Sequence, residues 1–70
     1  MHLTRLREAR NLAFLTQREL AEKAGMTQAT IARLETGQTK ARPTTTRRLA
    51  QALGIEPKEL IATKAEGESQ

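Results

Sequence analysis

The sequence predicts an all-α domain built from five short helices. Apolar residues recur at intervals of three and four, the two-residue alternation of strands is absent, and Gly25, Gly37 and Gly54 each follow a helical stretch. A chain of 70 residues without cysteine has room for one small core and no disulfide to support it. We therefore expect one compact domain over residues 1–62, followed by a flexible tail over residues 63–70.

The first helix is expected to run from Leu3 to Ala13. Leu3, Leu6, Arg10 and Ala13 share one face at helical spacing. Arg10 is a charge on an otherwise apolar face, so its guanidinium needs either a route to solvent or a carboxylate partner. Glu35, at the C-terminal end of the third helix, is the only carboxylate from the third helix through the fourth, and we expect a structural Arg10–Glu35 ion pair. Two independent surface charges are the alternative.

The second helix has clear start and stop signals. Thr16 and Glu19 have the spacing of a capping box, in which each side chain bonds the other's backbone N–H. Gly25 follows the last helical residue, where glycine takes the left-handed conformation at little cost. The residues expected to face inward are Leu20, Ala21 and Ala24.

The third helix follows after a very short turn. Thr27 is its expected cap, Gly37 ends it, and Ile31 and Leu34 are expected to point into the core. A link this short makes the second and third helices cross steeply, and Ala21 is small where the crossing is closest.

Two further helices complete the predicted fold. The fourth begins with Pro43 as first helical residue or with Thr44 as cap, and it ends at Gly54. Its expected inward residues are Thr46, Leu49, Ala50 and Leu53. The fifth is short, from Pro57 to Ala62, with apolar side chains at Leu60 and Ile61.

The composition argues against an enzyme and against a metal site. Phe14 is the only aromatic residue, His2 is the only histidine, and the chain has neither cysteine nor aspartate. Acid–base catalysis needs several titratable groups converging in a pocket. No apolar run has the length of a membrane span or of a signal peptide. We expect a cytoplasmic, nucleoid-associated protein with no cofactor and no small-molecule ligand.

The charge distribution suggests a polyanionic partner. The chain has 12 Lys and Arg against 8 Asp and Glu, a formal net charge of +4. The basic residues of its middle part are Arg33, Lys40, Arg42, Arg47 and Arg48. They are opposed there only by Glu35. A basic region on a small domain is typical of nucleic-acid binding, and an ordinary solvated surface is the alternative.

Residues 17–34 have the pattern of a DNA-binding helix-turn-helix. They combine two capped helices, a small residue at the crossing, a glycine in the turn and aliphatic residues inside. An ordinary pair of packed helices is the alternative. In the DNA interpretation the third helix lies in the major groove and presents Gln28, Ala29 and Arg33 to base edges. Glutamine can pair with adenine, arginine with guanine, and alanine can pack on a thymine methyl.

Phosphate contacts are expected from the start of the second helix and from both ends of the third. Free backbone N–H groups and a partial positive charge at a helix N-terminus suit a phosphate. The candidates are Gln17, Thr27, Thr30, Thr36, Gln38, Thr39, Lys40 and Arg42. Arg42 would reach toward the minor groove. Arg47 and Arg48 are either solvated or add to the positive field.

The segment "TQRELAEKAGMTQATIARLETGQTK" resembles the Cro/repressor (XRE-like) helix-turn-helix family, above all the DNA-binding domains of lambdoid phage repressors and Cro proteins. A weaker resemblance continues through "RRLAQALGIEPKEL". It implies a five-helix lambda-repressor-like domain that binds a pseudo-palindromic operator as a homodimer. It also supports the Arg10–Glu35 pair, and it places Phe14 where the family often has glycine.

The resemblance also implies a dimer interface. Family dimers commonly meet near the fifth helix, which corresponds here to Ile55, Pro57, Leu60 and Ile61. Core packing is the alternative for Leu60 and Ile61.

The predicted function is a sequence-specific, double-stranded DNA-binding transcriptional regulator, and the resemblance favours a repressor. An antitoxin that binds both its operator and a protein toxin is the alternative. A protein-interaction module without specific DNA contacts is a third possibility.

Overall fold

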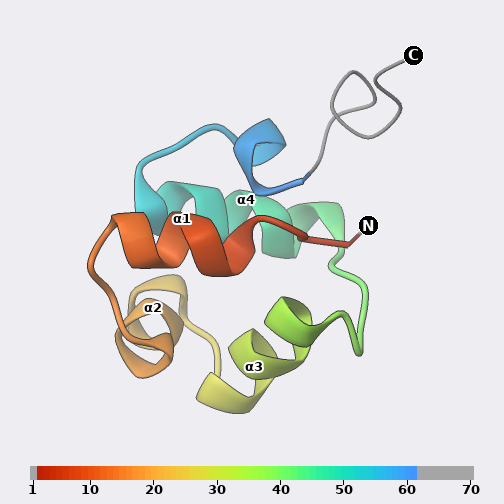
Figure 1. The fold of residues 1–70 in the computed structure, drawn as a ribbon, viewed down its shortest axis with the longest axis horizontal. Coiled ribbons are helices and arrows are strands. Elements are labelled where there is room, and N and C mark those ends of the chain that lie inside the picture. Colours follow the sequence, from red (N-terminus) through yellow and green to blue (C-terminus); the bar gives the residue numbers. More distant parts are fainter. Residues whose placement is uncertain (1, 62–70) are drawn as a thin grey trace.

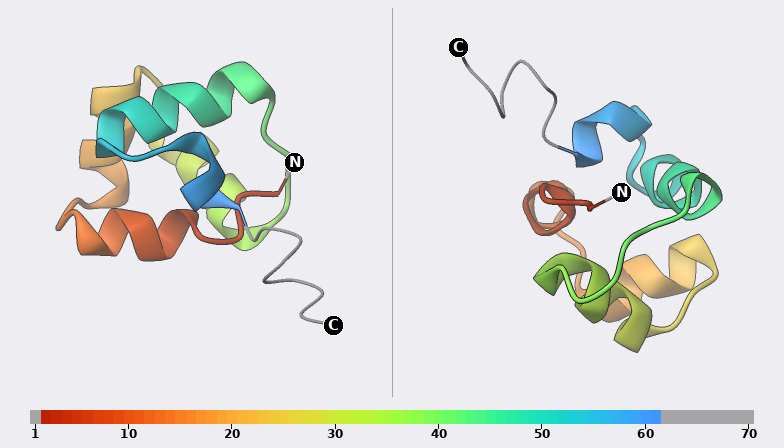
Figure 2. Two further views of the ribbon diagram at one scale, coloured as in Figure 1. Left: turned by 90° about the horizontal axis from the view of Figure 1, so that it is seen from above. Right: turned by 90° about the vertical axis from the view of Figure 1, so that its right-hand side faces the viewer.

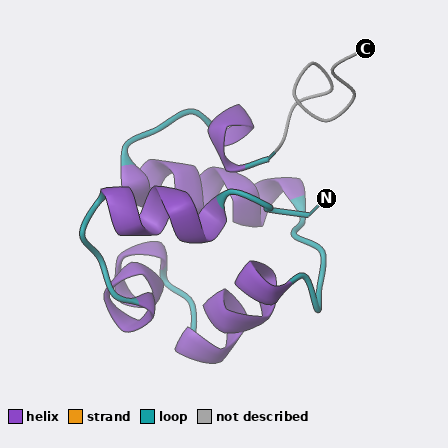
Figure 3. Ribbon diagram, in the orientation of Figure 1, coloured by secondary structure: helices purple, strands orange, loops and turns teal. Residues whose placement is uncertain are grey.

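The computed structural model describes residues 2–61, and all regular structure within them is helical, with no strand (Figures 1 and 3). In chain order the elements are α1 (Leu6–Leu12), α2 (Gln17–Ala24), α3 (Gln28–Thr36), α4 (Pro43–Leu53) and the 3₁₀ turn η1 (Pro57–Leu60). The all-α prediction is confirmed. The expected fifth α-helix is one short 3₁₀ turn, and both Ala62 and the expected tail over residues 63–70 lie outside the described residues.

The helices form a layered arrangement around one core. α1 and α4 lie on opposite sides of the core, α2 and α3 lie together at one end of it, and η1 lies between α1 and α4 at the other end (Figures 1 and 2). α4 packs against both α2 and η1, while α1 packs against α3 and η1. α1 and α2 therefore pack against one side of α3, and the residues on its other side are exposed.

The core is aliphatic and takes one completely buried side chain from every element. These residues are Leu6, Leu20, Ile31, Leu49 and Leu60, each 0% exposed. The other predicted inward residues of α2, α3 and α4 are buried as well, except that Leu53 is half-buried. Thr46 is the one polar residue among those described that is buried as a whole, backbone included, and its hydroxyl donates to the backbone oxygen of Arg42 at 3.1 Å.

The helix starts follow the local signals of the sequence. Glu19 N donates to Thr16 Oγ1 at 3.0 Å and Thr16 N donates to Glu19 Oε1 at 2.8 Å, which completes the predicted capping box. Thr27 caps α3, its hydroxyl accepting from Thr30 N. Pro43 is the first residue of α4 and Arg42 occupies the cap position, which decides between the two starts that the sequence allowed.

α1 is shorter than predicted at both ends. It begins at Leu6, because Leu3 to Arg5 form a turn in which Leu6 N donates to Leu3 O at 3.1 Å. Leu3 is still buried, but as part of the turn. Ala13, expected on the buried face, is exposed beyond the last helical turn, and Ala9 packs against the core instead.

Leu60 belongs to the core, and the predicted interface position is corrected accordingly. Its side chain is 0% exposed, and its carbonyl oxygen accepts from Arg5 N at 3.0 Å. η1 ends at Leu60, since the next residue, Ile61, has extended backbone angles. Ile55, Pro57 and Ile61 are half-buried and keep part of their surface exposed.

Phe14 is the least expected feature of the fold. It has a φ of 59°, in the left-handed region, and its side chain is 93% exposed. A non-glycine residue in this conformation is strained by about 1–2 kcal/mol, because Cβ crowds the next carbonyl oxygen. The turn between α1 and α2 therefore requires a conformation that favours glycine, at a position occupied by the only aromatic residue.

Phe14→Gly is expected to stabilise the domain by about 0.5–1 kcal/mol. The substitution relieves the left-handed strain, and the greater freedom of glycine in the unfolded chain offsets only part of that gain. Little burial is lost because the ring is 93% exposed. Urea unfolding followed by circular dichroism measures the change. Phe14→Ala is the matched control, since it removes the ring but keeps Cβ and therefore the strain. Equal stability of the two variants would show that Phe14 is not strained.

Candidate nucleic-acid interface

The orientation of α3 is set by the turn that precedes it. Gly25 has a φ of 72°, a conformation that lets the chain reverse directly after α2. Met26 N then donates to Ala21 O at 2.8 Å, which closes the turn. Ala21 is 2% exposed. Its small side chain permits the close approach of the two helices, so α3 starts after a turn of three residues, at a fixed angle to α2.

The two faces of α3 differ in chemistry. Ile31 is 0% and Leu34 is 3% exposed, so one face is held in the core. The predicted base-reading residues Gln28, Ala29 and Arg33 are all exposed on the other side. The side chains of Gln28 and Arg33 have no hydrogen-bond or ion-pair partner within residues 2–61. Their donors and acceptors are therefore available to a ligand.

A buried ion pair fixes the C-terminal end of α3. The Arg10 guanidinium forms two hydrogen bonds with the Glu35 carboxylate, from Nε to Oε2 and from Nη2 to Oε1 at 3.2 Å. The Glu35 side chain is 0% exposed and that of Arg10 is 13% exposed. The third nitrogen of Arg10 donates to Leu15 O at 2.9 Å. One arginine of α1 thus holds both the end of α3 and the loop before α2.

Two further side chains bind the same carboxylate. Gln17 Nε2 donates to Glu35 Oε1 at 3.0 Å, and Arg7 Nε donates to the same oxygen at 3.4 Å. Burial by itself raises the pKa of Glu35, but the hydrogen bonds of Arg10, Gln17 and Arg7 and the charge of Arg10 outweigh it. The pKa of Glu35 is consequently lowered, and the carboxylate is ionised at neutral pH.

A family model described as "Helix-turn-helix" matches residues 6–60, from the first residue of α1 to the last of η1. The chain belongs to this helix-turn-helix family. It is of the XRE or Cro/C1 type, whose members are DNA-binding transcription regulators. No curated protein and no solved structure matches the chain significantly.

The helix-turn-helix is thus α2 and α3, as the sequence predicts, and double-stranded DNA is the ligand of such domains. α3 has 9 residues. A helix of this length spans about 14 Å, which suits a major groove about 12 Å wide. None of the helices within residues 2–61 combines the length and apolar character needed to cross a bilayer, and no group of three or more potential metal ligands occurs there.

The predicted phosphate-binding residues fall into two groups. Those of the loop between α3 and α4 are exposed, with no side-chain partner among the described residues: Gln38, Thr39, Lys40 and Arg42. The others already have partners within the chain. Gln17 donates to Glu35, and the Thr36 hydroxyl donates to Ala32 O at 3.1 Å and Arg33 O at 3.2 Å.

The hydroxyls at the start of α3 share one hydrogen bond. Thr27 Oγ1 and Thr30 Oγ1 lie 2.9 Å apart, and Thr27 Oγ1 also accepts from Thr30 N at 3.2 Å. Whichever hydroxyl donates to the other, one hydroxyl proton of the pair stays available. This pair can therefore supply one donor to a phosphate without losing its cap.

Arg7 was not among the residues expected from the sequence. It joins Glu35 from α1, three residues before Arg10. The spacing of the two arginines, one helical turn apart, was the available signal, but only the packing of α1 against α3 shows that both reach the same carboxylate.

Proposed function

We propose that this protein is a sequence-specific transcriptional repressor that binds a pseudo-palindromic operator as a homodimer. The supporting observation is the free outer face of α3, on which Gln28, Ala29 and Arg33 are exposed. Its other face is held by the core and by the Glu35 ion pair. A rigid helix with unpaired polar groups facing outward is the arrangement that base recognition in the major groove needs.

The three side chains divide the recognition between them. Gln28 pairs with N6 and N7 of an adenine, Arg33 with O6 and N7 of a guanine, and Ala29 packs on a thymine methyl. Each good bidentate pair discriminates against a wrong base by about 1–3 kcal/mol. Because Ala29 cannot form hydrogen bonds with its side chain, it distinguishes bases only by apolar contact.

Phosphate contacts position α3 in the groove. The exposed residues of the α3–α4 loop bind the backbone on one side, with Lys40 and Arg42 providing charge. On the other side, the Thr27–Thr30 pair and the start of α2 at Gln17 contact the backbone. Gln17 keeps its backbone N–H and the second hydrogen of its amide for this contact, since one hydrogen is used by Glu35.

Homodimerisation would match the two-fold symmetry of the operator. Two copies related by a two-fold axis place their recognition helices about 34 Å apart, one turn of DNA. We propose Ile55, Pro57 and Ile61 as the contact, since each keeps part of its apolar surface exposed. Such a patch is small, so DNA would contribute much of the assembly. Occupation of the operator then blocks RNA polymerase.

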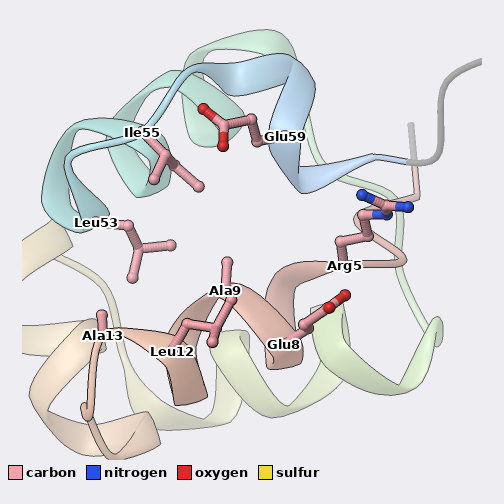
Figure 4. A pocket seen from close by; sticks show the side chains of 8 residues that line it. All are labelled: Arg5, Glu8, Ala9, Leu12, Ala13, Leu53, Ile55 and Glu59. Atoms are coloured by element: carbon pink, nitrogen blue, oxygen red, sulfur yellow. The ribbon is translucent and has the colours of Figure 1, made fainter.

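An apolar groove supports the second candidate, an antitoxin that also binds a protein toxin. The groove lies between α1 and the α4–η1 connection, on the side of α1 away from α3, and measures about 270 Å³ (Figure 4). Ala9, Leu12, Leu53 and Ile55 line it, and Leu12 is 73% exposed. Apart from Ile55, which we also propose as a dimer contact, none of these residues has a role in the proposed DNA binding. Co-purification of a stoichiometric partner protein that Leu12→Ser abolishes would favour this candidate.

Arg33→Ala tests base reading. We first select bound sites from random duplexes, and expect two symmetric half-sites about one helical turn apart. Arg33→Ala is then expected to lose about 1–3 kcal/mol of discrimination at one base pair of each half-site. Arg48→Ala, which removes the same charge from α4, is the control and should keep the selected sequence. Equal losses on all sequences, or recovery of no preferred sequence by the wild type, would contradict the proposal.

A further inference from the structure

We infer that Arg7 binds a backbone phosphate of the DNA and that Glu35 holds it in position. This inference rests on the proposed function, because it adds a contact to the same ligand. It concerns α1, which contributes no residue to the phosphate contacts proposed above. Three observations support it: the charge balance around Glu35, the free nitrogens of Arg7, and the place of Arg7 in the fold.

The cluster around Glu35 has one more positive than negative charge. Arg10 uses Nε, Nη1 and Nη2 in hydrogen bonds within the chain, and its side chain is only 13% exposed. Its charge is therefore matched by the carboxylate, and it has little surface to offer a ligand. The surplus charge lies on Arg7, whose side chain is 59% exposed.

The guanidinium of Arg7 is tethered but largely unused. Its Nε donates to Glu35 Oε1 at 3.4 Å, and its two terminal nitrogens have no partner within residues 2–61. Those nitrogens carry four N–H donors in a planar fork that matches a phosphate. A long side chain already held near its tip loses less freedom on binding than a free one, so the contact to Glu35 prepares Arg7 for a ligand.

Arg7 also lies at the edge of the DNA-binding elements. Glu35 Oε1 accepts from both Arg7 and Gln17, so these two side chains meet at one atom. Gln17 is the first residue of α2, and Glu35 lies in the last turn of α3. With α3 in the major groove, the start of α2 faces the neighbouring backbone. The free end of Arg7 is thereby placed beside that strand.

A purely structural role for Arg7 makes a different prediction. If Arg7 only stabilises Glu35, its removal lowers stability but leaves the salt dependence of DNA binding unchanged. If it binds a phosphate, removal lowers the slope of log K against log salt by about 0.9 for each lost contact. The slope is a property of the folded complex, so it separates the two roles.

The experiment measures binding of the full chain to a fixed duplex of mixed sequence and to the selected operator, from low to moderate salt. Arg7→Ala and Arg7→Gln are expected to bind about tenfold more weakly, with a shallower slope. Arg7→Gln keeps a hydrogen-bond donor for Glu35, so it can replace Arg7→Ala in the experiment if Arg7→Ala folds poorly. Arg7→Lys keeps the charge and should keep the slope. Lys23→Ala, at the opposite end of α2, is the matched control for loss of one charge.

Phosphate ethylation identifies the contact. We expect one phosphate in each half-site whose ethylation weakens the wild type but not Arg7→Gln. A slope that Arg7→Gln leaves unchanged, or changes no more than Lys23→Ala does, would overturn the inference while the proposed function stands. Absence of salt-dependent DNA binding by the wild type itself would overturn both, and needs no variant to detect.

Discussion

Arg10→Met is expected to destabilise the domain by about 3 kcal/mol, the lower part of the range for breaking a buried ion pair. The substitution leaves the Glu35 carboxylate, 0% exposed, without its main partner. Gln17 and Arg7 still donate to one of its oxygens, which limits the loss. A core this small supplies only about 3–5 kcal/mol in total, so much of the variant is expected to be unfolded at 25 °C. Urea unfolding followed by circular dichroism measures this.

The double variant Arg10→Met/Glu35→Leu is the matched control. It removes both charges, and it should recover most of the lost stability because no buried charge is left unpaired. Acid supplies a second check. Since the pKa of Glu35 is lowered in the folded state, its stabilising effect is present above the unfolded pKa and is lost as the pH falls through the folded value. Equal urea midpoints for wild type and Arg10→Met would contradict the role of the pair.

Leu60→Ala is expected to cost about 2–5 kcal/mol of stability, whatever the oligomeric state. Leu60 is 0% exposed and η1 contributes it to the core between α1 and α4, so the substitution opens a cavity. The expected result is the same loss of stability relative to the wild type in dilute and in concentrated samples. Loss of a dimer-interface residue would instead cost more stability in concentrated samples, where the wild type is dimeric.

Ile61→Ser is the matched control for Leu60→Ala. Ile61 is half-buried, so its substitution should cost less stability and should affect assembly on the operator more than folding. If Leu60→Ala unfolded at the same urea midpoint as the wild type, the placement of Leu60 in the core would be wrong.

Much of the fold was predictable because the signals are local. Capping at Thr16 and Thr27 depends on residues three positions apart. Gly25 and Gly37 end their helices in the left-handed conformation, which depends on the residue type at that one position. The inward direction of Ile31 likewise follows from helical spacing. These features were sufficient to define α2, the turn and α3.

The parts of the fold that the sequence did not predict depend on contacts between distant residues. The periodicity of a helix gives the direction of each side chain around its axis, but not the element that it will meet. The start of α1 and the place of Leu60 are examples: Arg5 N, directly before α1, donates to Leu60 O across most of the chain, and the Leu60 side chain packs in the core. The left-handed conformation of Phe14 is likewise imposed by the turn that joins α1 to α2.

The sequence by itself determined that α3 is a capped helix with an apolar inner face and a polar outer one, since residues three and four apart decide this. The sequence also predicted the Arg10–Glu35 pair, since a guanidinium on an apolar helix face needs a carboxylate, and the structure confirms it. Only the tertiary structure decided that Arg7 and Gln17 join this carboxylate, through contacts between residues 28 and 18 positions apart. The physical reason is that charge pairing is specific only once folding has removed water from the carboxylate and fixed which donors lie within reach.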